Sequence, residues 1–507
     1  MKIYIIAIFF LFGLCIQMQS QEMTLSKKQM YEDFDELIHI LQDCNAQLPI
    51  RKIVTGIDQI ALAKSLRSAI DTISTTDSFI ALLNTVLNYM YDIHARESNA
   101  YFVGYDNLKG IDTAIMSYRE NNKDFSNKHL FPANPLFANG EYFIPGIYQM
   151  IDLENRDTIF LYYSKIISYK GIPYEKYVQD NLAYFSPIGT RWDNEKKEYY
   201  SITSLIPFTD TIKVENQGNE IDIDLGRKYK ISITQTDTVC KKEDVQKSKF
   251  PLGEKKVLYF EEDSILYIYL NDMIDFENLI PLKIKNIGKL KPISKIIIDV
   301  RGNRGGGDLV WHNILRAIVA DTLIYDPVIA FKNTKRLKKF YSYPNAFADI
   351  RKLDIKVFDW CPDESFLVTN FEHTFLIPDS NSLQYTGKIY IIQNEEVYYA
   401  GHSLTTYASH IEQLVSIGEP SGLFAGFGLS PNLFQLKHSK FSFRIELAID
   451  VSEVKEPSDV YQNIPEIIVA IPPKEKFEYI KDHSYDKQSK EYLYKYDYLF
   501  RKIAEMK

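Results

Sequence analysis

One stretch of the sequence decides the fold: Lys295-Ile-Ile-Ile-Asp299-Val300-Arg301-Gly302-Asn303-Arg304-Gly305-Gly306-Gly307-Asp308. It begins as an apolar run typical of a buried strand, continues as a glycine-rich turn and ends where a helix can start. Consecutive glycines let backbone N–H groups point at an anion or a developing oxyanion, and the helix N-terminus reinforces this. The spacing matches neither GxxxxGK[ST] nor GxGxxG, so a phosphate-binding loop is disfavoured. A tight strand-to-helix turn without a ligand remains the alternative.

Strands and helices alternate on both sides of this stretch. The pattern predicts strands at Ile265–Leu270, Lys295–Val300, Leu323–Phe331 and Lys388–Gln393, and helices near Phe276–Ile287, Asp308–Ala320 and Tyr398–His410. Such alternation predicts an α/β core of layered sheet and helices over residues 255–473. The charged, aromatic tail that follows, residues 474–507, is expected to be a surface helix or arm.

A second strand, turn and helix lie in the same core. The strand pattern of Gly387–Gln393 is followed by the turn at 394–397 and then by a predicted helix. A turn of this kind can present one side chain above a sheet edge, which is how nucleophiles are often exposed.

The residues that precede the core divide into a helical part and a β-rich part. Residues 21–98 are expected to form a helical N-terminal domain, because apolar residues recur along them at steps of 3 and 4. The clearest stripe contains Met30, Phe34, Leu37, Leu41 and Cys44. Residues 99–254 have short alternating runs and predict a β-rich middle domain, in which residues 166–182 read as a strand, a glycine turn and a short helix.

The first 20 residues predict a signal peptide. Lys2 precedes an apolar run from Ile3 to Ile16, which is too short for a membrane span but fits the apolar region of a secretory leader. We expect cleavage after Ser20 and export to a periplasm or to the outside of the cell. No other stretch of the sequence is long and apolar enough to span a membrane.

Composition excludes several classes of function. The 507 residues contain 59 Lys and Arg against 67 Asp and Glu, a net charge of −8, which argues against a protein that binds nucleic acid backbone. Without the leader three cysteines remain, and no CxxC spacing is present, so neither a disulfide framework nor a zinc ribbon is expected. No HExxH or similar spacing indicates a catalytic metal, and no cofactor is expected.

Several motifs, taken in order, resemble the tail-specific (C-terminal-processing) serine peptidases. They are Asp299-x-Arg301-x-Asn303-x-Gly305-Gly306, the turn at 394–402, Gly418-Glu419 and Pro465-Glu466. Asp92-x-His94 resembles the Asp-Gly-His element of the branch akin to tricorn protease, and residues 166–182 are similar to the ligand-binding strand and helix of a PDZ-like module. The resemblance implies a ClpP/crotonase-like core, peptide-bond hydrolysis and a polypeptide substrate.

The resemblance also implies roles for individual residues. The N–H groups around Gly305 or Gly306, with that of Ala400, would form an oxyanion hole, and His94 would be the general base. The nucleophilic serine belongs where Tyr399 stands. A phenol is not a plausible nucleophile for acyl transfer here, and its bulk would fill the space of the scissile carbonyl. The Ser–Lys dyad of the other branch is missing too, because residues 389–436 contain no Lys or Arg.

Two interpretations of the function remain open. In the first, the protein is an exported homologue of these peptidases. Its hydrolysis is impaired or lost unless another hydroxyl replaces that of the expected serine. Ser403, one helical turn after Tyr399, is the alternative nucleophile, and His402 stands where the family has glutamate. In the second, the protein is a non-catalytic binder of a peptide or an apolar ligand in the former active-site cleft. The oligomeric state is open in both.

Overall fold

The computed structural model describes the chain over the following residues: 24–92, 95–97, 135–182, 190–193, 196–202, 204, 206, 210–233, 255–275, 277–303, 305–325, 328–339, 347–349, 359, 361, 364–370, 374–421, 432–452, 463–481 and 486–506. The signal peptide predicted at residues 1–20 lies outside these residues, as does His94. Within the described chain, no helix is both long enough and apolar enough to cross a membrane.

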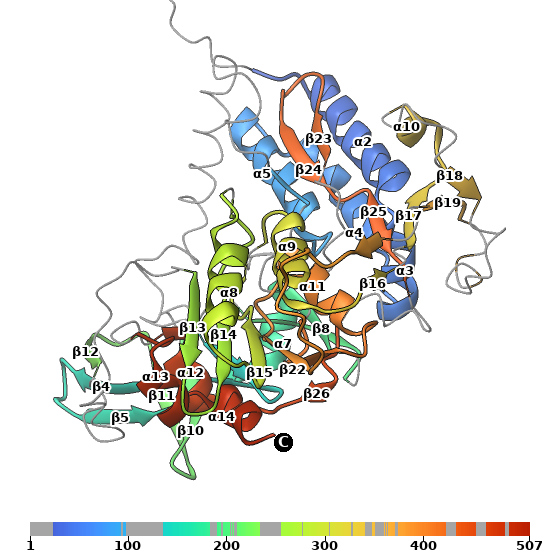
Figure 1. The fold of residues 1–507 in the computed structure, drawn as a ribbon. Helices are drawn as coiled ribbons and strands as arrows, with labels where there is room; N and C mark the ends of the chain where they lie inside the picture. The colour runs from blue at the N-terminus through green and yellow to red at the C-terminus, as the bar shows by residue number, and fades with distance from the viewer. Residues whose placement is uncertain are drawn as a thin grey trace, which may run out of the picture.

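A six-stranded sheet forms the centre of the α/β core (Figure 1). Its strands, in spatial order, are β13 (Lys256–Phe260), β14 (Ile265–Tyr269), β15 (Lys295–Asp299), β21 (Ile389–Gln393), β22 (Leu414–Gly418) and β26 (Ile467–Ile468). All neighbours are parallel except β13, which is antiparallel to β14. Parallel strands buried on both faces read as continuous apolar runs, which is why the sequence revealed them.

Helices cover both faces of this sheet. Alternate side chains of the strands, such as Ile296 and Ile298, pack in one apolar cluster with α8 (Leu279–Leu290), α9 (Leu309–Ile318) and α11 (Ala400–Ala408). The intervening side chains, such as Ile297 and Tyr390, pack with α13 (Lys490–Lys495) and α14 (Tyr498–Glu505). The predicted α/β layering is therefore confirmed.

The prediction of a surface helix or arm at 474–507 is right about the helical structure and wrong about the surface position. Helix α12 (Pro473–Lys481) is followed by α13 and α14, and Leu499, Phe500 and Ile503 of α14 are all buried in the second cluster. The physical reason is that every strand of a parallel sheet carries apolar side chains on both faces, so the second face needs its own cover.

The strand predicted at Leu323–Phe331 is also wrong as a single element. It is divided into β16 (Leu323–Tyr325), which pairs with β20 (Thr374–Leu376), and β17 (Val328–Lys332). Strand β17 belongs to a separate sheet with β18 (Phe347–Asp349), β19 (Phe366–Asn370) and β25 (Ala448–Asp450). The short helix α10 (Lys335–Lys338) follows β17.

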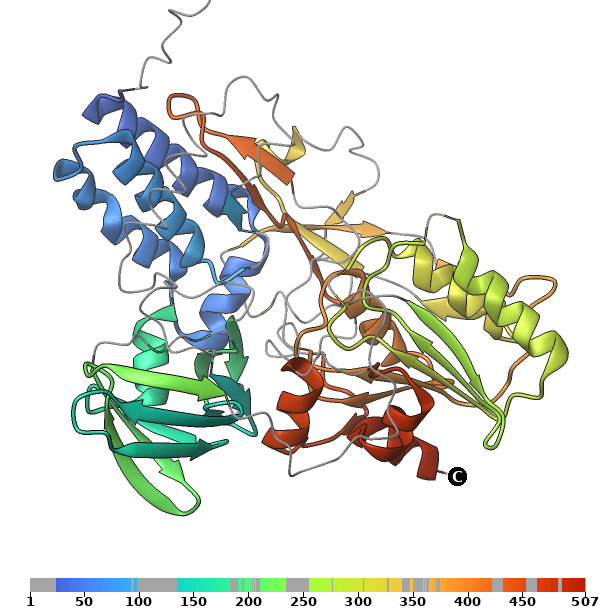
Figure 2. The same ribbon diagram turned by 90° about the vertical axis from the view of Figure 1, so that its left-hand side faces the viewer.

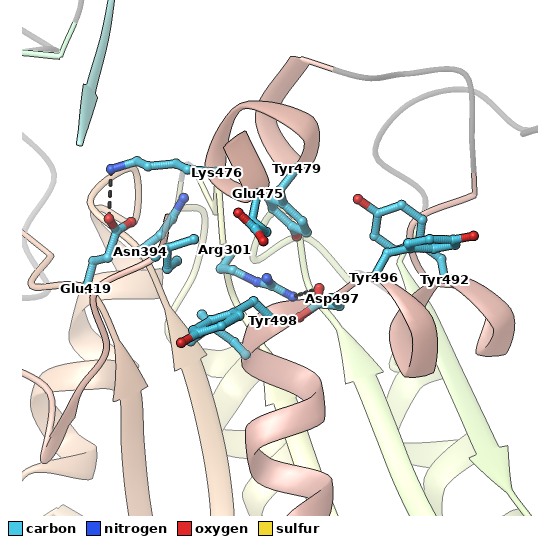
Figure 3. Close-up of a pocket in the computed structure, with 12 residues that line it drawn as sticks. Arg301, Asn394, Glu419, Glu475, Lys476, Tyr479, Tyr492, Tyr496, Asp497 and Tyr498 are labelled. Carbon is cyan, nitrogen blue, oxygen red and sulfur yellow. Dashed lines mark hydrogen bonds and ion pairs between the residues drawn. The ribbon is translucent and has the colours of Figure 1, made fainter. Parts of the chain in front are cut away.

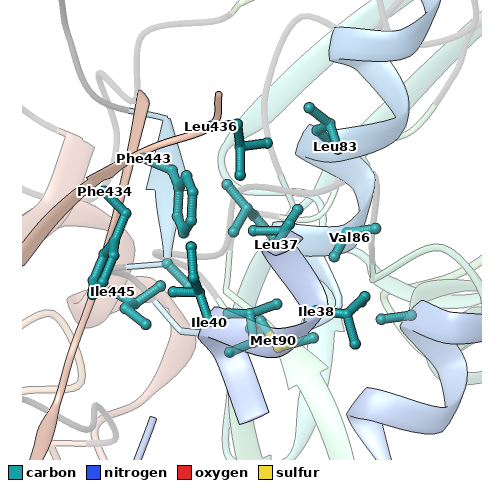
Figure 4. Packing of buried hydrophobic residues seen from close by; sticks show 14 of the residues in the cluster. Leu37, Ile38, Ile40, Leu83, Val86, Met90, Phe434, Leu436, Phe443 and Ile445 are labelled. Carbon is teal, nitrogen blue, oxygen red and sulfur yellow. The ribbon is translucent and has the colours of Figure 1, made fainter. Parts of the chain in front are cut away.

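The N-terminal helices share their core with a distant hairpin. The helices are α2 (Lys27–Cys44), α3 (Gln47–Thr55), α4 (Gln59–Ser65) with the 3₁₀ turn η1 (Leu66–Asp71), and α5 (Thr76–Asn88). Ser26 caps α2 with a capping box, and every residue of the predicted stripe is buried. Strands β23 (Asn432–Gln435) and β24 (Ser442–Ile445) pack against α2 and α5 through Phe434 and Phe443 (Figures 2 and 4). The helices therefore do not enclose a core of their own.

The middle of the chain is β-rich, as expected. A first sheet has the order β11-β10-β6-β3-β2 with β7 paired to β6, a second the order β12-β4-β5, and β8 pairs with β9. The bounds are β2 (Leu136–Ala138), β3 (Glu141–Phe143), β4 (Ile147–Asp152), β5 (Thr158–Tyr162), β6 (Lys165–Tyr169), β7 (Ile172–Pro173), α7 (Tyr174–Asp180), β8 (Thr190–Asp193), β9 (Glu198–Ser201), β10 (Thr211–Asn216), β11 (Asn219–Asp224) and β12 (Tyr229–Ile233). The strand, glycine turn and helix predicted at 166–182 are confirmed as β6, Gly171 with φ of 72°, and α7.

Candidate active site

The glycine turn after β15 is held against the chain that follows β14. Gly305 and Gly306 have φ of 90° and 140°, which side chains other than glycine rarely adopt. A β-carbon on Gly306 would come within 2.2 Å of the Met273 carbonyl oxygen. The Met273 N–H donates to the Gly305 carbonyl at 2.8 Å, and the Gly307 N–H donates to the Met273 carbonyl at 2.8 Å. These two hydrogen bonds with Met273 fix the conformation of the glycine turn.

Asn303 joins the turn to the start of α11. Its Nδ2 donates to the Leu270 carbonyl at 2.8 Å, and its Oδ1 accepts the Gly305 N–H at 2.9 Å. The Tyr398 N–H donates to the Asn303 carbonyl at 3.0 Å. The Gly305 N–H therefore already has an acceptor within the turn. Among the residues that the structure describes, the N–H groups of Gly306 and Ala400 have no acceptor.

Tyr399 is the N-cap residue immediately before α11. Its φ of 57° and ψ of −130° lie in a region that is sparsely populated for residues with a side chain, at a cost of about 1–3 kcal/mol. Its side chain lies against the glycine turn, since a β-carbon added at Gly305 would approach the Tyr399 Cβ to 2.4 Å. A strained residue between a strand and a helix is the arrangement that exposes a nucleophile. Here it holds a phenol ring.

Arg301 ties the same turn to the C-terminal helices. Its guanidinium is buried, and Nε lies 2.9 Å from Asp299 Oδ1 while Nη2 lies 2.7 Å from Asp497 Oδ2. The ring of Tyr479 lies 4.0 Å from the guanidinium carbon, completing a site that Figure 3 shows. The two carboxylates outweigh burial and hold the pKa of Arg301 well above its ordinary value. Asp497 also caps α14 by accepting the Phe500 N–H at 2.8 Å.

A second buried group of charges lies beside Arg301, across the same small cavity (Figure 3). Lys476 Nζ lies 2.7 Å from both Glu395 and Glu419. One lysine cannot compensate two buried carboxylates fully. Burial raises the pKa of Glu419 to about 7, and the Glu395 charge adds to this against the opposing effect of Lys476. These contacts hold α12 on the ends of β21 and β22.

The comparisons with known proteins agree with this geometry. Residues 264–457 match the model of peptidase family S41. The matched segment makes up most of the α/β core, which is therefore similar in sequence to peptidase family S41. The resemblance to the tail-specific peptidases is therefore confirmed.

Several solved structures are similar to the chain at low sequence identity. Mature CPAF is 12% identical, with a TM-score of 0.50 over 89% of this chain and 94% of that chain. The photosystem II D1 C-terminal processing protease is 12% identical, covering 87% and 92% with a TM-score of 0.34. Tricorn protease is 14% identical, covering 90% and 35% with a TM-score of 0.34. No curated protein sequence matches the chain.

Ser403, the alternative nucleophile, and Ser421 are both engaged in packing. Ser403 is 4% exposed, and its hydroxyl donates to the Tyr399 carbonyl at 3.4 Å. Ser421 is fully buried, with its Oγ 3.1 Å from His402 Nδ1. Burial, with a smaller effect of the Arg191 charge, lowers the pKa of His402 to about 4. A pKa this low makes His402 a weak base for Ser421, although its imidazole is neutral near pH 7.

The general base assigned by resemblance cannot be placed. His94 lies outside the described residues, so its role stays a prediction. Its described neighbours are the buried Asp92 and the short strand β1 (Arg96–Glu97), which pairs with β24. Glu466, which the resemblance included, is exposed. In the part of the chain that is described, no three His, Cys, Asp or Glu side chains gather as a metal site.

Sequence reasoning missed three contributors to the site. Asp497 and Lys476 come from the segment that was expected to be a surface tail. The third is Arg444 on β24, whose pKa burial and the Arg96 charge lower, with the Tyr399 phenol opposing them. The apolar positions of α14 could have indicated the packing of that helix, but no local signal links any of these residues to residues 299–306.

Proposed function

We propose that this protein is an exported homologue of the tail-specific peptidases that has lost, or nearly lost, peptide-bond hydrolysis and binds polypeptide in the former active-site cleft. One observation carries the proposal. Tyr399 adopts the strained conformation at the start of α11 and packs its ring against Gly305, where the family needs a serine hydroxyl.

A phenol at this position opposes acyl transfer for two reasons. Its oxygen lies at the far end of the ring, so a carbonyl carbon at the serine position would overlap ring atoms. A serine triad that loses its nucleophile loses on the order of 10⁶-fold in turnover, leaving a weak background from oxyanion donors and binding. The packed positions of Ser403 and Ser421 favour the same conclusion.

Peptide binding can remain after hydrolysis is lost, because it depends on groups other than the nucleophile. The N–H groups of Gly306 and Ala400 lack acceptors among the described residues, and such donors suit a peptide carbonyl. Strand β6 and helix α7 supply the elements that resemble a PDZ-like ligand site, and we include a role in holding chain termini in the proposal. The leader at residues 1–20 supports export.

A fluorophosphonate probe tests the loss of hydrolysis directly. The purified mature protein should not be labelled. Tyr399→Ser restores a hydroxyl at the strained position and should be labelled at residue 399 if the remaining machinery is intact, whereas Tyr399→Ala, the matched control, should not. An adduct mapped to Ser403 or Ser421 in the unaltered protein would overturn the proposal.

Binding is tested separately with fluorescein-labelled peptides and fluorescence anisotropy on the unaltered protein. Saturable binding that competes with unlabelled peptide supports a peptide-binding cleft. Absence of binding by peptides of varied sequence would contradict it, independently of the labelling result.

A further inference from the structure

Helix α8 carries apolar side chains on the face that points away from the core. Its inner face, with Ile280 and Ile284, is buried in the apolar cluster of the sheet. On its outer face Leu279, Leu282 and Leu290 are 46%, 54% and 79% exposed. Figure 2 shows α8, in yellow-green, at the right-hand edge of the molecule. A surface helix usually has polar residues on such a face, so these leucines need an explanation.

The three leucines form a single stripe with a lysine on each side. At about 100° per residue, Leu282, Leu279 and Leu290 lie within an arc of about 80°. Lys289 lies about 20° beyond one border of this arc, and Lys283 lies about 20° beyond the other. Lysine stems can lie along an apolar surface while their ammonium groups stay in a polar layer. The outer face of α8 therefore has an apolar centre and two basic borders.

The helix is basic although the chain as a whole is acidic. Residues 279–291 contain four lysines and no Asp or Glu, whereas the net charge of the chain is −8. Among the described residues, the exposed Lys283 and Lys289 form no ion pair. The other two lysines form the ion pairs Lys285–Asp379 and Lys291–Glu261. The two lysines at the borders of the leucine stripe are thus the ones left available for an external anion.

Helix α9 adds apolar surface at the start of α8. Asn313 Nδ2 donates to Oδ1 of Asn278, the residue before α8, at 2.8 Å. Leu309 is one turn before Asn313 on the same side of α9 and is 66% exposed. The apolar surface therefore continues from α8 to the start of α9, which follows the glycine turn.

The arrangement of charge favours an anionic surface as the partner. A second copy of the chain that docked through the same stripe would bring like charges together, which opposes association. The stripe runs along the helix with a lysine on each side, so one flat surface can take up the leucines and meet both lysines. A bilayer with anionic headgroups has these properties, because its phosphates lie just outside its acyl chains.

We propose that α8 docks the protein on an anionic membrane surface. The leucine stripe enters the boundary between headgroups and acyl chains, and Lys283 and Lys289 contact the headgroup phosphates. The helix lies in the plane of the surface and does not cross it, in agreement with the absence of a membrane-spanning helix in the described chain. This inference goes beyond the proposed function, since it involves neither Tyr399 nor a peptide.

Vesicle flotation tests the charge requirement on the full mature protein. Vesicles of equal parts phosphatidylglycerol and phosphatidylcholine should bind it at low salt at least about tenfold more tightly than phosphatidylcholine alone, because each lysine near an anionic surface strengthens binding about fivefold. Changing Lys283→Gln and Lys289→Gln together should remove most of this preference. The matched control, Lys335→Gln with Lys338→Gln, removes two exposed lysines from α10 and should retain it.

A leucine variant tests insertion without changing the charge. Leu282→Ser should weaken binding to the anionic vesicles about tenfold. Leu62→Ser, the control, removes a leucine that is 39% exposed on α4 and should leave binding unchanged. Each substituted side chain is exposed, so unchanged melting temperatures should accompany all four variants.

Three results would overturn the proposal. The first is equal binding, or no binding, to neutral and anionic vesicles. The second is a loss of binding in the α10 control as large as in the α8 variant. The third is a dimer that dissociates in Leu282→Ser while the unaltered protein ignores vesicles, which would show that a second copy covers the stripe.

Discussion

The ring of Tyr399 lies directly against the backbone of Gly305, so close that a β-carbon on the glycine would meet the Tyr399 Cβ at 2.4 Å. The contact joins the turn after β15 to the start of α11. It depends on the absence of a side chain at 305 and on the strained backbone at 399. In the function proposed above, this phenol occupies the position of the serine nucleophile.

Gly305→Ala should destabilise the protein by about 3 kcal/mol or more, because it adds a steric clash with Tyr399 to an unfavourable φ of 90°. Urea unfolding measures the loss. Gly307→Ala is the matched control, since its β-carbon would meet nothing within 4 Å, and it should change stability by less than about 1 kcal/mol. Equal losses in the two variants would contradict the packing described here.

Arg301→Gln should destabilise the protein by about 3–5 kcal/mol, because it leaves Asp299 and Asp497 buried without their counter-ion. Asp497→Asn should cost clearly less, since Asn can still cap α14 and Arg301 keeps Asp299. Limited proteolysis should show early cleavage of the C-terminal helices in Arg301→Gln. If Arg301→Gln is as stable as Asp497→Asn, the ion pair between Arg301 and Asp497 does not anchor the C-terminal helices.

The features of this chain that could be predicted from the sequence are those that depend on residues close together in the sequence. The stripe of α2 repeats every turn, and the apolar run of β15 ends in its own glycine turn, so both are visible locally. By contrast, Arg301 and Asp497 are 196 residues apart, and Arg96 meets Arg444 only after β1 joins a hairpin from the far end of the chain. Such pairs are created by tertiary packing, which no local pattern encodes.

The tail shows a different kind of failure. Leu499 and Ile503 are four residues apart, which is an apolar stripe, but it is interrupted by charged residues that face solvent or bind Asp497. Composition therefore indicated a surface helix or arm, whereas periodicity indicates a helix with one buried face.

Stability should depend on pH through Glu419. Its folded-state pKa, about 7, is above the ordinary value of 4.5, so the folded state binds more protons between these pH values. Its contribution is therefore present below about pH 4.5 and is lost as the pH rises to about 7. The difference in unfolding free energy between the unaltered protein and Glu419→Gln should fall across this window, by on the order of 3 kcal/mol at most.

The matched control for this prediction is Glu412→Gln. The Glu412 side chain is 98% exposed and meets solvent in both states, so its removal should leave the shape of the pH curve unchanged. His402, with its pKa lowered to about 4, contributes in the opposite direction, since its stabilisation is lost as the pH falls from about 6.5. Only the difference between variants isolates Glu419. A flat difference from pH 4.5 to 7 would rule out the raised pKa.

Phe443→Ala should destabilise the N-terminal helices as well as the hairpin that carries it. Phe443 is fully buried between β24 and the helices, and its removal should cost about 3–5 kcal/mol. Because the helices lack a separate core, α2 should lose hydrogen-exchange protection together with β24. Leu433→Ala is the control on the paired strand; its side chain is 37% exposed, and α2 should keep its protection. Protection of α2 that survives Phe443→Ala would mean that the helices fold independently, and the shared core would then contribute only to docking.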